Sequence, residues 1–305
     1  MHATEHTIRY GLLKGMWRLL AFIPLPILYG LSDILFYMVY HLARYRRRIT
    51  RKNLIESFPE KSRREITGIE KRFYRFFVDL MFEMCKMTAF SEQEMRRRMR
   101  FTHLEEVQQV LDSGKSISVY IGHYGNWEWI SSLPVHLSGP VVAGQIYHRL
   151  HNRAVNRLLL RNRSQWGSVN VEMNETFRWI HRHFYAGQVT ITGYIADQAP
   201  RSANVQHHVH FLNHQTTALT GTEKITRKYG FDAYYLDIER KRRGYYEARF
   251  VRMPDDETQA LSGFALTDKY FELLEQTIRR RPECYLWTHN RFKHPTTKLL
   301  QDIQL

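Results

Sequence analysis

The chain has 305 residues, of which 43% are hydrophobic, enough for one large domain with a buried core and an N-terminal appendage. Its 45 Lys and Arg against 30 Asp and Glu give a net charge of +15, so partners are expected among polyanions: nucleic acid, an anionic lipid surface or an acidic carrier protein. The two cysteines, Cys85 and Cys284, show no CxxC or His-rich pairing, so the sequence indicates neither a disulfide framework nor a zinc site, and a reducing compartment fits.

The most apolar stretch of the chain spans residues 19–43. As a helix of some 25 residues it would reach the roughly 30 Å needed to cross a bilayer. Pro24 and Pro26 favour a helix that begins near Ile27, and Asp33 would cost on the order of 3 kcal/mol at a bilayer centre. We therefore expect a membrane-anchoring helix that spans the bilayer or lies in its interface. The alternative is a helix hairpin in a soluble core.

A run of bases follows this stretch, and we call it the basic collar: Arg44, Arg46, Arg47, Arg48, Arg51 and Lys52. Beside an anchor, each base would gain about 1 kcal/mol at an anionic leaflet. The alternative is a solvated helix face. The resulting division is an anchor with the collar as far as Arg48 over residues 1–48, and a second domain over 49–305.

The rest of the chain alternates between patterns of helices and strands. Apolar spacings of three and four over residues 63–90 predict an amphipathic helix whose aromatic groups face the core. A helix is also expected at 104–110 and an arginine-rich one after residue 150. Strands are expected at 116–121, 141–150, 188–197 and 231–239. This rhythm predicts an α/β fold with a central mixed sheet flanked by helices.

Residues 116–130, SISVYIGHYGNWEWI, carry the densest group of chemical side chains. Apolar alternation predicts a strand with one buried face, then a turn at Gly122 and a helix capped by Asn126. Glu128 would lie in the first helical turn, where the helix dipole favours a carboxylate. From there it could accept a hydrogen bond from His123 and leave the other ring nitrogen basic, which is general-base chemistry for acyl transfer. A surface turn without catalytic function is the alternative.

Other polar groups gather at strand ends and on one helix. Arg161 and Arg163 could bind a phosphate through a two-pronged guanidinium contact, or form a solvated helix face. Asp197 and Gln198 end a strand and could orient His123, bind substrate or cap the next turn. The histidines at 207, 208, 210 and 214 do not predict a metal site, because alternate strand positions point to opposite faces.

Several of these strings resemble one family. HYGNWE is similar to the His-x4-Asp/Glu motif of the glycerolipid acyltransferases, and its Gly-Asn-Trp-Glu part resembles the lipid A biosynthesis (lauroyl and myristoyl) acyltransferases. YRRRITRKNLIESFP, TITGYIADQ and PECYLWTHNRFK are similar to further segments of that family, so the likeness covers most of residues 40–294 in order.

The resemblance implies functions for particular residues. His123 and Glu128 would be catalytic, and Arg163, with Arg161 second, would match an arginine needed for activity. Further residues implied to contact substrate are Asn126, Asp197, Gln198, Lys224 and His289. The chain departs from the family at Leu212-Asn213, where a Phe-Gly pair is usual, so chain-length or donor preference does not carry over directly.

The function implied is transfer of a fatty acyl chain from a thioester, on acyl carrier protein or coenzyme A, to a hydroxyl of a lipid A precursor. The family resemblance also implies a glycerolipid acyltransferase-like fold on the cytoplasmic face of a bacterial inner membrane, with no metal, no nucleotide cofactor and no nucleic acid partner. One alternative is acylation of another membrane lipid, such as a glycerophospholipid, a mannolipid or an amino-acid lipid. The other is a non-catalytic basic membrane- or nucleic-acid-binding protein of the same fold.

Overall fold

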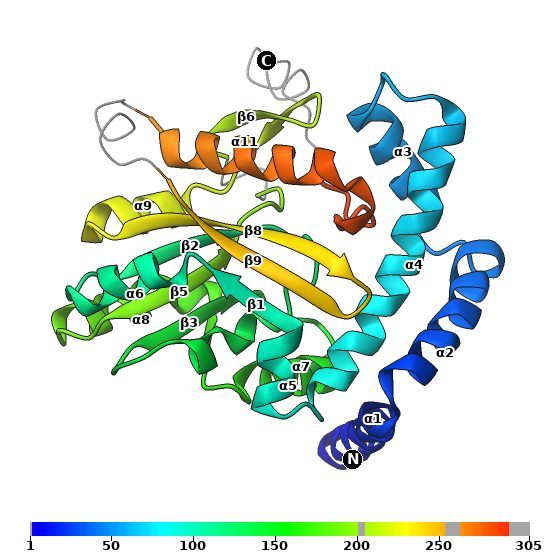
Figure 1. Cartoon of the computed structure of the whole chain (residues 1–305), viewed down its shortest axis with the longest axis horizontal. Coiled ribbons are helices and arrows are strands. Elements are labelled where there is room, and N and C mark those ends of the chain that lie inside the picture. Colours follow the sequence, from blue (N-terminus) through cyan, green and yellow to red (C-terminus); the bar gives the residue numbers. More distant parts are fainter. Residues whose placement is uncertain (1, 201–204, 254–262, 293–305) are drawn as a thin grey trace.

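A mixed β-sheet forms the centre of the computed structural model, which describes residues 2–200, 205–253 and 263–292 (Figure 1). Its seven strands have the order β1-β9-β8-β2-β5-β3-β4, and all neighbours are parallel except β8 and β9. The strands are β1 (Met99–Thr102), β2 (Ile117–Ile121), β3 (Val142–Tyr147), β4 (Val169–Glu172), β5 (Thr190–Ile195), β8 (Asp232–Arg242) and β9 (Tyr245–Arg252). A separate antiparallel pair contains β6 (His208–Phe211) and β7 (His214–Thr217). The predicted α/β class with a central mixed sheet is confirmed.

Helices surround this sheet. The domain helices are α3 (Arg47–Ser57), α4 (Arg63–Met87), α5 (Glu92–Arg98), α6 (Leu104–Asp112), α7 (Arg153–Ser164), α8 (Thr176–Tyr185), α9 (Gly221–Tyr229) and α11 (Ala265–Arg280). Short 3₁₀ helices are η2 (Trp129–His136), η3 (Met173–Glu175) and η5 (Pro282–Cys284). Figure 1 shows α11 lying over β8 and β9, while α4 stands between the sheet and the N-terminal helices.

The strand that leads to His123, β2, has three strands on either side of it. Sequence alternation predicts one buried face, but all five of its residues are buried. The reason is that helices cover both faces of a largely parallel sheet, so Ser118 and Tyr120 are as inaccessible as Val119. The prediction of a half-exposed strand is therefore wrong.

The predicted 63–90 helix is confirmed as α4. Ser62 caps it in a capping box, accepting from the Glu65 N–H while the Glu65 carboxylate accepts from the Ser62 N–H. Its predicted aromatic stripe lies in the main core, where Phe73 and Phe76 are almost wholly buried. The two cysteines are buried free thiols.

The predicted anchor consists of several helical pieces: α1 (His2–Phe22), α2 (Leu25–Tyr37) and the π-helix η1 (Met38–Leu42). The chain breaks at Ile23 and Pro24, because Pro24 cannot continue α1 but suits the cap of α2. Residues 25–42 are long and apolar enough to cross a membrane, although 28% of that window is buried against the protein. Both α1 and α2 pack on α4. Asp33 is exposed and pairs with Arg243 at 3.0 Å.

Part of the basic collar has an internal function that the sequence did not indicate. Arg47 and Arg51 each donate at 2.6 Å to Glu70, which is fully buried on α4. Arg46 donates to the Thr288 carbonyl at 3.1 Å. These three bases join α3 and the segment before it to the domain, so neither a free collar nor a solvated face describes them. The expected boundary at residue 48 falls inside α3, and the domain's last 13 positions, 293–305, lie outside the described residues.

Candidate active site

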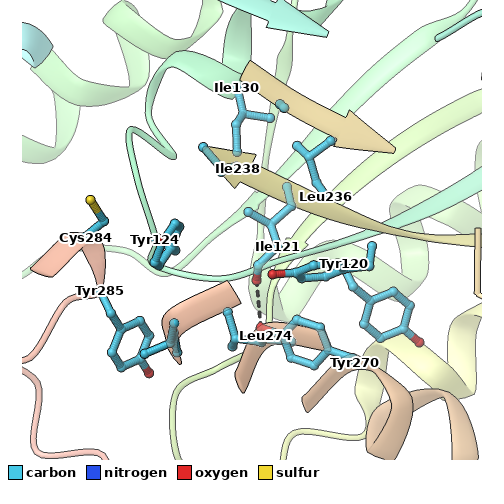
Figure 2. Close-up of a cluster of buried hydrophobic side chains, with 14 of the residues drawn as sticks. Tyr120, Ile121, Tyr124, Ile130, Leu236, Ile238, Tyr270, Leu274, Cys284 and Tyr285 are labelled. Atoms are coloured by element: carbon cyan, nitrogen blue, oxygen red, sulfur yellow. Dashed lines mark hydrogen bonds between the residues drawn. The ribbon is translucent and has the colours of Figure 1, made fainter. Parts of the chain in front are cut away.

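His123 lies on a sharp turn directly after β2. Two glycines permit this turn: a Cβ on Gly122 would lie 2.5 Å from Leu274 Cδ1 on α11, and Gly125 has φ +58° with Ile238 equally close. Figure 2 shows the packed side chains under the turn, with the Tyr270 hydroxyl donating to the Ile121 carbonyl at 2.8 Å. The turn therefore rests on a filled core.

The C-terminal segment holds the turn from the other side. The Gly125 N–H donates to the Cys284 carbonyl at 3.0 Å, and the Leu286 N–H donates to the His123 carbonyl at 3.1 Å. Between these two hydrogen bonds, Tyr124 and Tyr285 pair as an isolated antiparallel β-bridge. Figure 2 shows the two residues near each other. Sequence reasoning did not assign this task to PECYLWTH, although the specificity of that string was a signal of its importance.

The ring of His123 contacts the carboxylate of Asp197, with 2.7 Å between Nδ1 and Oδ1. The other oxygen accepts from the His123 backbone N–H at 3.3 Å. Burial alone would raise the pKa of Asp197, but the His123 ring and the Tyr285 hydroxyl outweigh it and hold that pKa below its ordinary value. An ionised Asp197 accepts the Nδ1 proton, which leaves Nε2 as the basic nitrogen.

Gln198 marks the position in front of this basic nitrogen. Its Nε2 lies 3.3 Å from His123 Nε2, so its amide can donate to the ring where a substrate hydroxyl would also donate. The Trp127 ring meets the His123 ring edge-on, with 5.3 Å between centroids. The histidine is thus fixed by Asp197 behind, Gln198 in front and Trp127 at its side.

Glu128 is not the hydrogen-bond partner of His123, which corrects the expectation from sequence. Its carboxylate accepts two hydrogen bonds from Arg163, from Nε at 2.8 Å and from Nη2 at 2.6 Å. Burial would raise the pKa of Glu128, but Arg163 lowers it below its ordinary value. The expected α-helix is also absent here: Glu128 precedes the 3₁₀ helix η2, which begins at Trp129. The arginine fork expected to bind a phosphate is therefore directed at a carboxylate of the protein.

Asn126 is fully buried, so the structure does not support its predicted contact with substrate. It does keep a capping function, because its Oδ1 accepts from the Trp129 N–H at 3.2 Å. Its amide nitrogen donates to the buried carboxylate of Glu83 on α4 at 2.8 Å. Asn126 thereby stabilises the turn through buried hydrogen bonds.

A groove of about 770 Å³ opens in front of His123. His123, Glu128, Arg163, Gln198 and His289 all contribute to its lining. Much of the remaining wall is apolar and includes Val119, Ile121, Ile130, Leu133, Ile191, Ile195 and Leu236. Such a volume, with polar groups beside a large apolar stretch of wall, is typical of a small-molecule or lipid-chain site.

Four predicted substrate-binding residues do not line this groove: Asn126 and Asp197, whose contacts are given above, and Arg161 and Lys224. Arg161 faces another cavity, on the opposite side of α7. Lys224 is exposed on α9 and donates to Gln206 at 2.5 Å. Within the described residues, no three His, Cys, Asp or Glu side chains group closely enough to hold a metal.

The arrangement places a histidine with a carboxylate partner, the pattern of a general base, beside a partly apolar groove. A comparison with known families identifies its class, since the profile described as bacterial lipid A biosynthesis acyltransferase matches residues 2–294. The chain belongs to this family.

Named relatives agree with this assignment to the acyltransferases. A lipid A biosynthesis acyltransferase of Haemophilus influenzae is 22% identical over 279 residues, which is 88% of this chain and 82% of the relative. The lipid A biosynthesis palmitoleoyltransferase of Escherichia coli is 23% identical over 290 residues, 89% of this chain and 86% of the relative. These relatives support the family assignment. The acyl chain named for a relative describes that relative and is not transferred to this chain.

Proposed function

We propose that this acyltransferase moves a fatty acyl chain from a thioester, with acyl carrier protein as donor, to a hydroxyl of a lipid A precursor. The observation that carries the proposal is the His123–Asp197 pair, whose histidine lines a partly apolar groove, in a chain of this family. The pair supplies a base for the hydroxyl, and the groove offers apolar surface for the chain.

The proposed reaction begins with proton transfer to His123. Nε2 takes the proton of the acceptor hydroxyl while that oxygen attacks the thioester carbonyl, and Asp197 stabilises the imidazolium that forms. The new C–O bond gives a tetrahedral intermediate. The C–S bond then breaks, and the leaving thiolate receives the proton from His123. In this reaction the acceptor hydroxyl would replace the Gln198 amide as the group that donates to His123 Nε2.

We assign Arg163 an electrostatic function in this reaction. Because Glu128 holds its guanidinium by two hydrogen bonds, the charge has a fixed position on the groove wall. A fixed positive charge in a water-poor site stabilises an oxyanion more than a mobile one. This electrostatic function replaces the expectation that Arg163 binds a substrate phosphate. We assign no function in the reaction to Arg161 or Lys224.

We also propose attachment to the cytoplasmic face of the bacterial inner membrane, where acyl thioesters are available. Support comes from large apolar side chains exposed on α1 and α2. These are Leu12, Met16, Leu19, Phe22, Ile27, Leu31, Ile34 and Tyr37. Such a surface is unusual on a soluble monomer and suits an apolar environment.

The test uses purified full-length protein with acyl carrier protein thioester and a diglucosamine lipid A precursor. His123→Ala should lower kcat by about 100-fold or more, the usual contribution of a general base. Asp197→Asn should cost nearly as much, and the double variant should be little worse than His123→Ala, because the two groups act as a unit. His151→Ala, an exposed histidine outside the groove, is the matched control.

Two outcomes would contradict the proposal. If His123→Ala keeps more than about a tenth of the wild-type rate, His123 is not the general base. If the protein acylates a glycerophospholipid and no diglucosamine lipid, the acceptor is wrong.

A further inference from the structure

A second cavity, of about 420 Å³, lies between α1, the C-terminal end of α4 and α7. Lys14, Trp17, Arg18 and Phe22 on α1 face Leu158 and Arg161 on α7 across it. None of its lining residues also lines the groove at His123. Its volume is within the roughly 300–1,000 Å³ of small-molecule sites.

The charge of this cavity is entirely positive. Lys14, Arg18 and Arg161 contribute three cations, and no Asp or Glu belongs to the lining. None of the three has a salt-bridge partner in the described part of the chain, whereas Arg163, two positions along α7, is paired with Glu128. Unpaired cations around one cavity favour an anionic ligand.

The walls of the cavity are held in place. The Trp17 indole N–H donates to the Thr88 hydroxyl at 2.8 Å, and that hydroxyl donates to Asn162 Oδ1 at 2.9 Å. Asn162 in turn donates to the Met84 carbonyl at 2.9 Å. Beside the cavity, the Arg157 guanidinium lies 4.6 Å from the centroid of the Tyr10 ring. These contacts join α1 to α4 and α7.

Apolar surface continues from the cavity onto the outside of α1. Trp17, Ala21, Phe22 and Leu158 give the cavity an apolar wall, and Phe22 is also 78% exposed. Leu19, 72% exposed, extends the same helix surface. A ligand that fits both parts carries an anionic group and a hydrocarbon chain. The recess is too small to admit a folded carrier protein.

We propose that this cavity binds a membrane phospholipid through its phosphate head group. Lys14, Arg18 and Arg161 contact the phosphate oxygens, and the upper part of one acyl chain lies against Trp17, Phe22 and Leu158. The site goes beyond the acyl-transfer reaction and takes no part in it. A bound lipid joins α1 to α7 and so fixes the N-terminal helices relative to the helix that carries Arg163.

The experiment measures lipid binding to the full-length protein in neutral detergent by native mass spectrometry. Phosphatidylglycerol is the anionic probe and phosphatidylcholine the zwitterionic comparison. Arg18→Gln/Arg161→Gln should weaken phosphatidylglycerol binding by tenfold or more. Arg64→Gln/Arg100→Gln removes the same charge from exposed positions outside both cavities and should change binding less than twofold.

A photoreactive phosphatidylglycerol locates the bound lipid, with cross-links expected in peptides 14–22 and 158–165. Equal loss in both double variants, or equal binding of phosphatidylcholine, would overturn the proposed head-group contact. Cross-links confined to peptide 127–133 would place the lipid in the catalytic groove and overturn the second site, while leaving the acyl-transfer proposal untouched. Competition by inorganic phosphate without a lipid chain would show that the apolar wall is not used.

Discussion

The partner of His123 is set by sheet register and not by nearness in sequence. β2 and β5 are parallel neighbours with Ile121 opposite Ile195, so the residues two positions on, His123 and Asp197, leave the same edge of the sheet together. They are 74 positions apart in sequence and 2.7 Å apart in space. Glu128 is only five positions away, but the turn directs its carboxylate to Arg163.

The Glu128–Arg163 pair should make stability depend on pH. The pKa of Glu128 is lowered in the folded protein, so the pair stabilises it above the ordinary carboxyl pKa. That contribution is lost as the pH falls through the lower, folded-state value. Unfolding by guanidinium chloride at a series of pH values should show this acid loss in the wild type and much less of it in Glu128→Gln.

At neutral pH, Glu128→Gln should cost about 1.5–3 kcal/mol, because it takes the charged acceptor from Arg163, whose side chain is 21% exposed. The control is Glu128→Leu/Arg163→Met, which removes both charges and should be more stable than Glu128→Gln alone. A double variant less stable than the single one would mean that packing, and not the unpaired charge, sets the cost.

Among the elements, α4 connects the N-terminal helices to the turn that carries His123. Its Glu83 is fully buried and accepts from the Tyr29 hydroxyl on α2 at 2.9 Å and from the Tyr246 hydroxyl on β9 at 2.8 Å. The amide of Asn126, three residues after His123, donates to the same carboxylate. Four elements of the structure thus meet at one side chain.

Substitution of Glu83 should separate size from charge. Burial raises the pKa of Glu83, and Asp79 adds to this effect while Arg240 opposes it. Glu83→Gln keeps the size and can still accept from Asn126, so the free energy of unfolding should fall by about 1 kcal/mol or less. Glu83→Ala leaves three donors without an acceptor and should cost about 3 kcal/mol or more. Denaturant unfolding measures the free energy of unfolding of both variants. Equal decreases would show that the three hydrogen bonds to Glu83 do not set its contribution to stability.

At the scale of the whole molecule, the exposed apolar residues gather on the N-terminal helices, on the outer side of α4 (Figure 1). The charged residue of α2, Asp33, is also exposed, but it is paired with Arg243. The side of the molecule formed by α1 and α2 is therefore suited to contact lipid, and α4 separates it from the sheet.

Replacing two outward residues of α2 should weaken membrane binding without changing the fold. Ile27 and Ile34 are 57% and 63% exposed, so Ile27→Gln/Ile34→Gln removes little packing. Each fully buried side chain is worth about 1.5–3 kcal/mol, so partition into anionic vesicles should fall by about tenfold or more. Phe184→Gln/Tyr185→Gln on α8 is the control. The proposed membrane face would be contradicted if vesicle partition fell equally in both variants. It would also be contradicted if the α2 variant partitioned like the wild type.

The sequence by itself determined the features that depend on local spacing. The apolar periods predicted α4, α6 and the strands β2, β3, β5 and β8, because a helix or strand imposes its period on the residues it buries. The two prolines predicted the break before α2. The strings around His123, Asp197 and residues 282–289 predicted the family. Asp197 was one of several alternatives for orienting the histidine, and nothing local could choose it over Glu128.

Only the tertiary structure decided which charged groups meet. Arg163 is paired with Glu128, Arg47 and Arg51 with Glu70, and Asp33 with Arg243, and the partners lie between 19 and 210 positions apart. Contacts of this kind follow from strand order and helix packing, which bring distant segments together and exclude water from some charges but not others. A pattern of residue types records that a charge is present, while its partner and its exposure are properties of the packed chain.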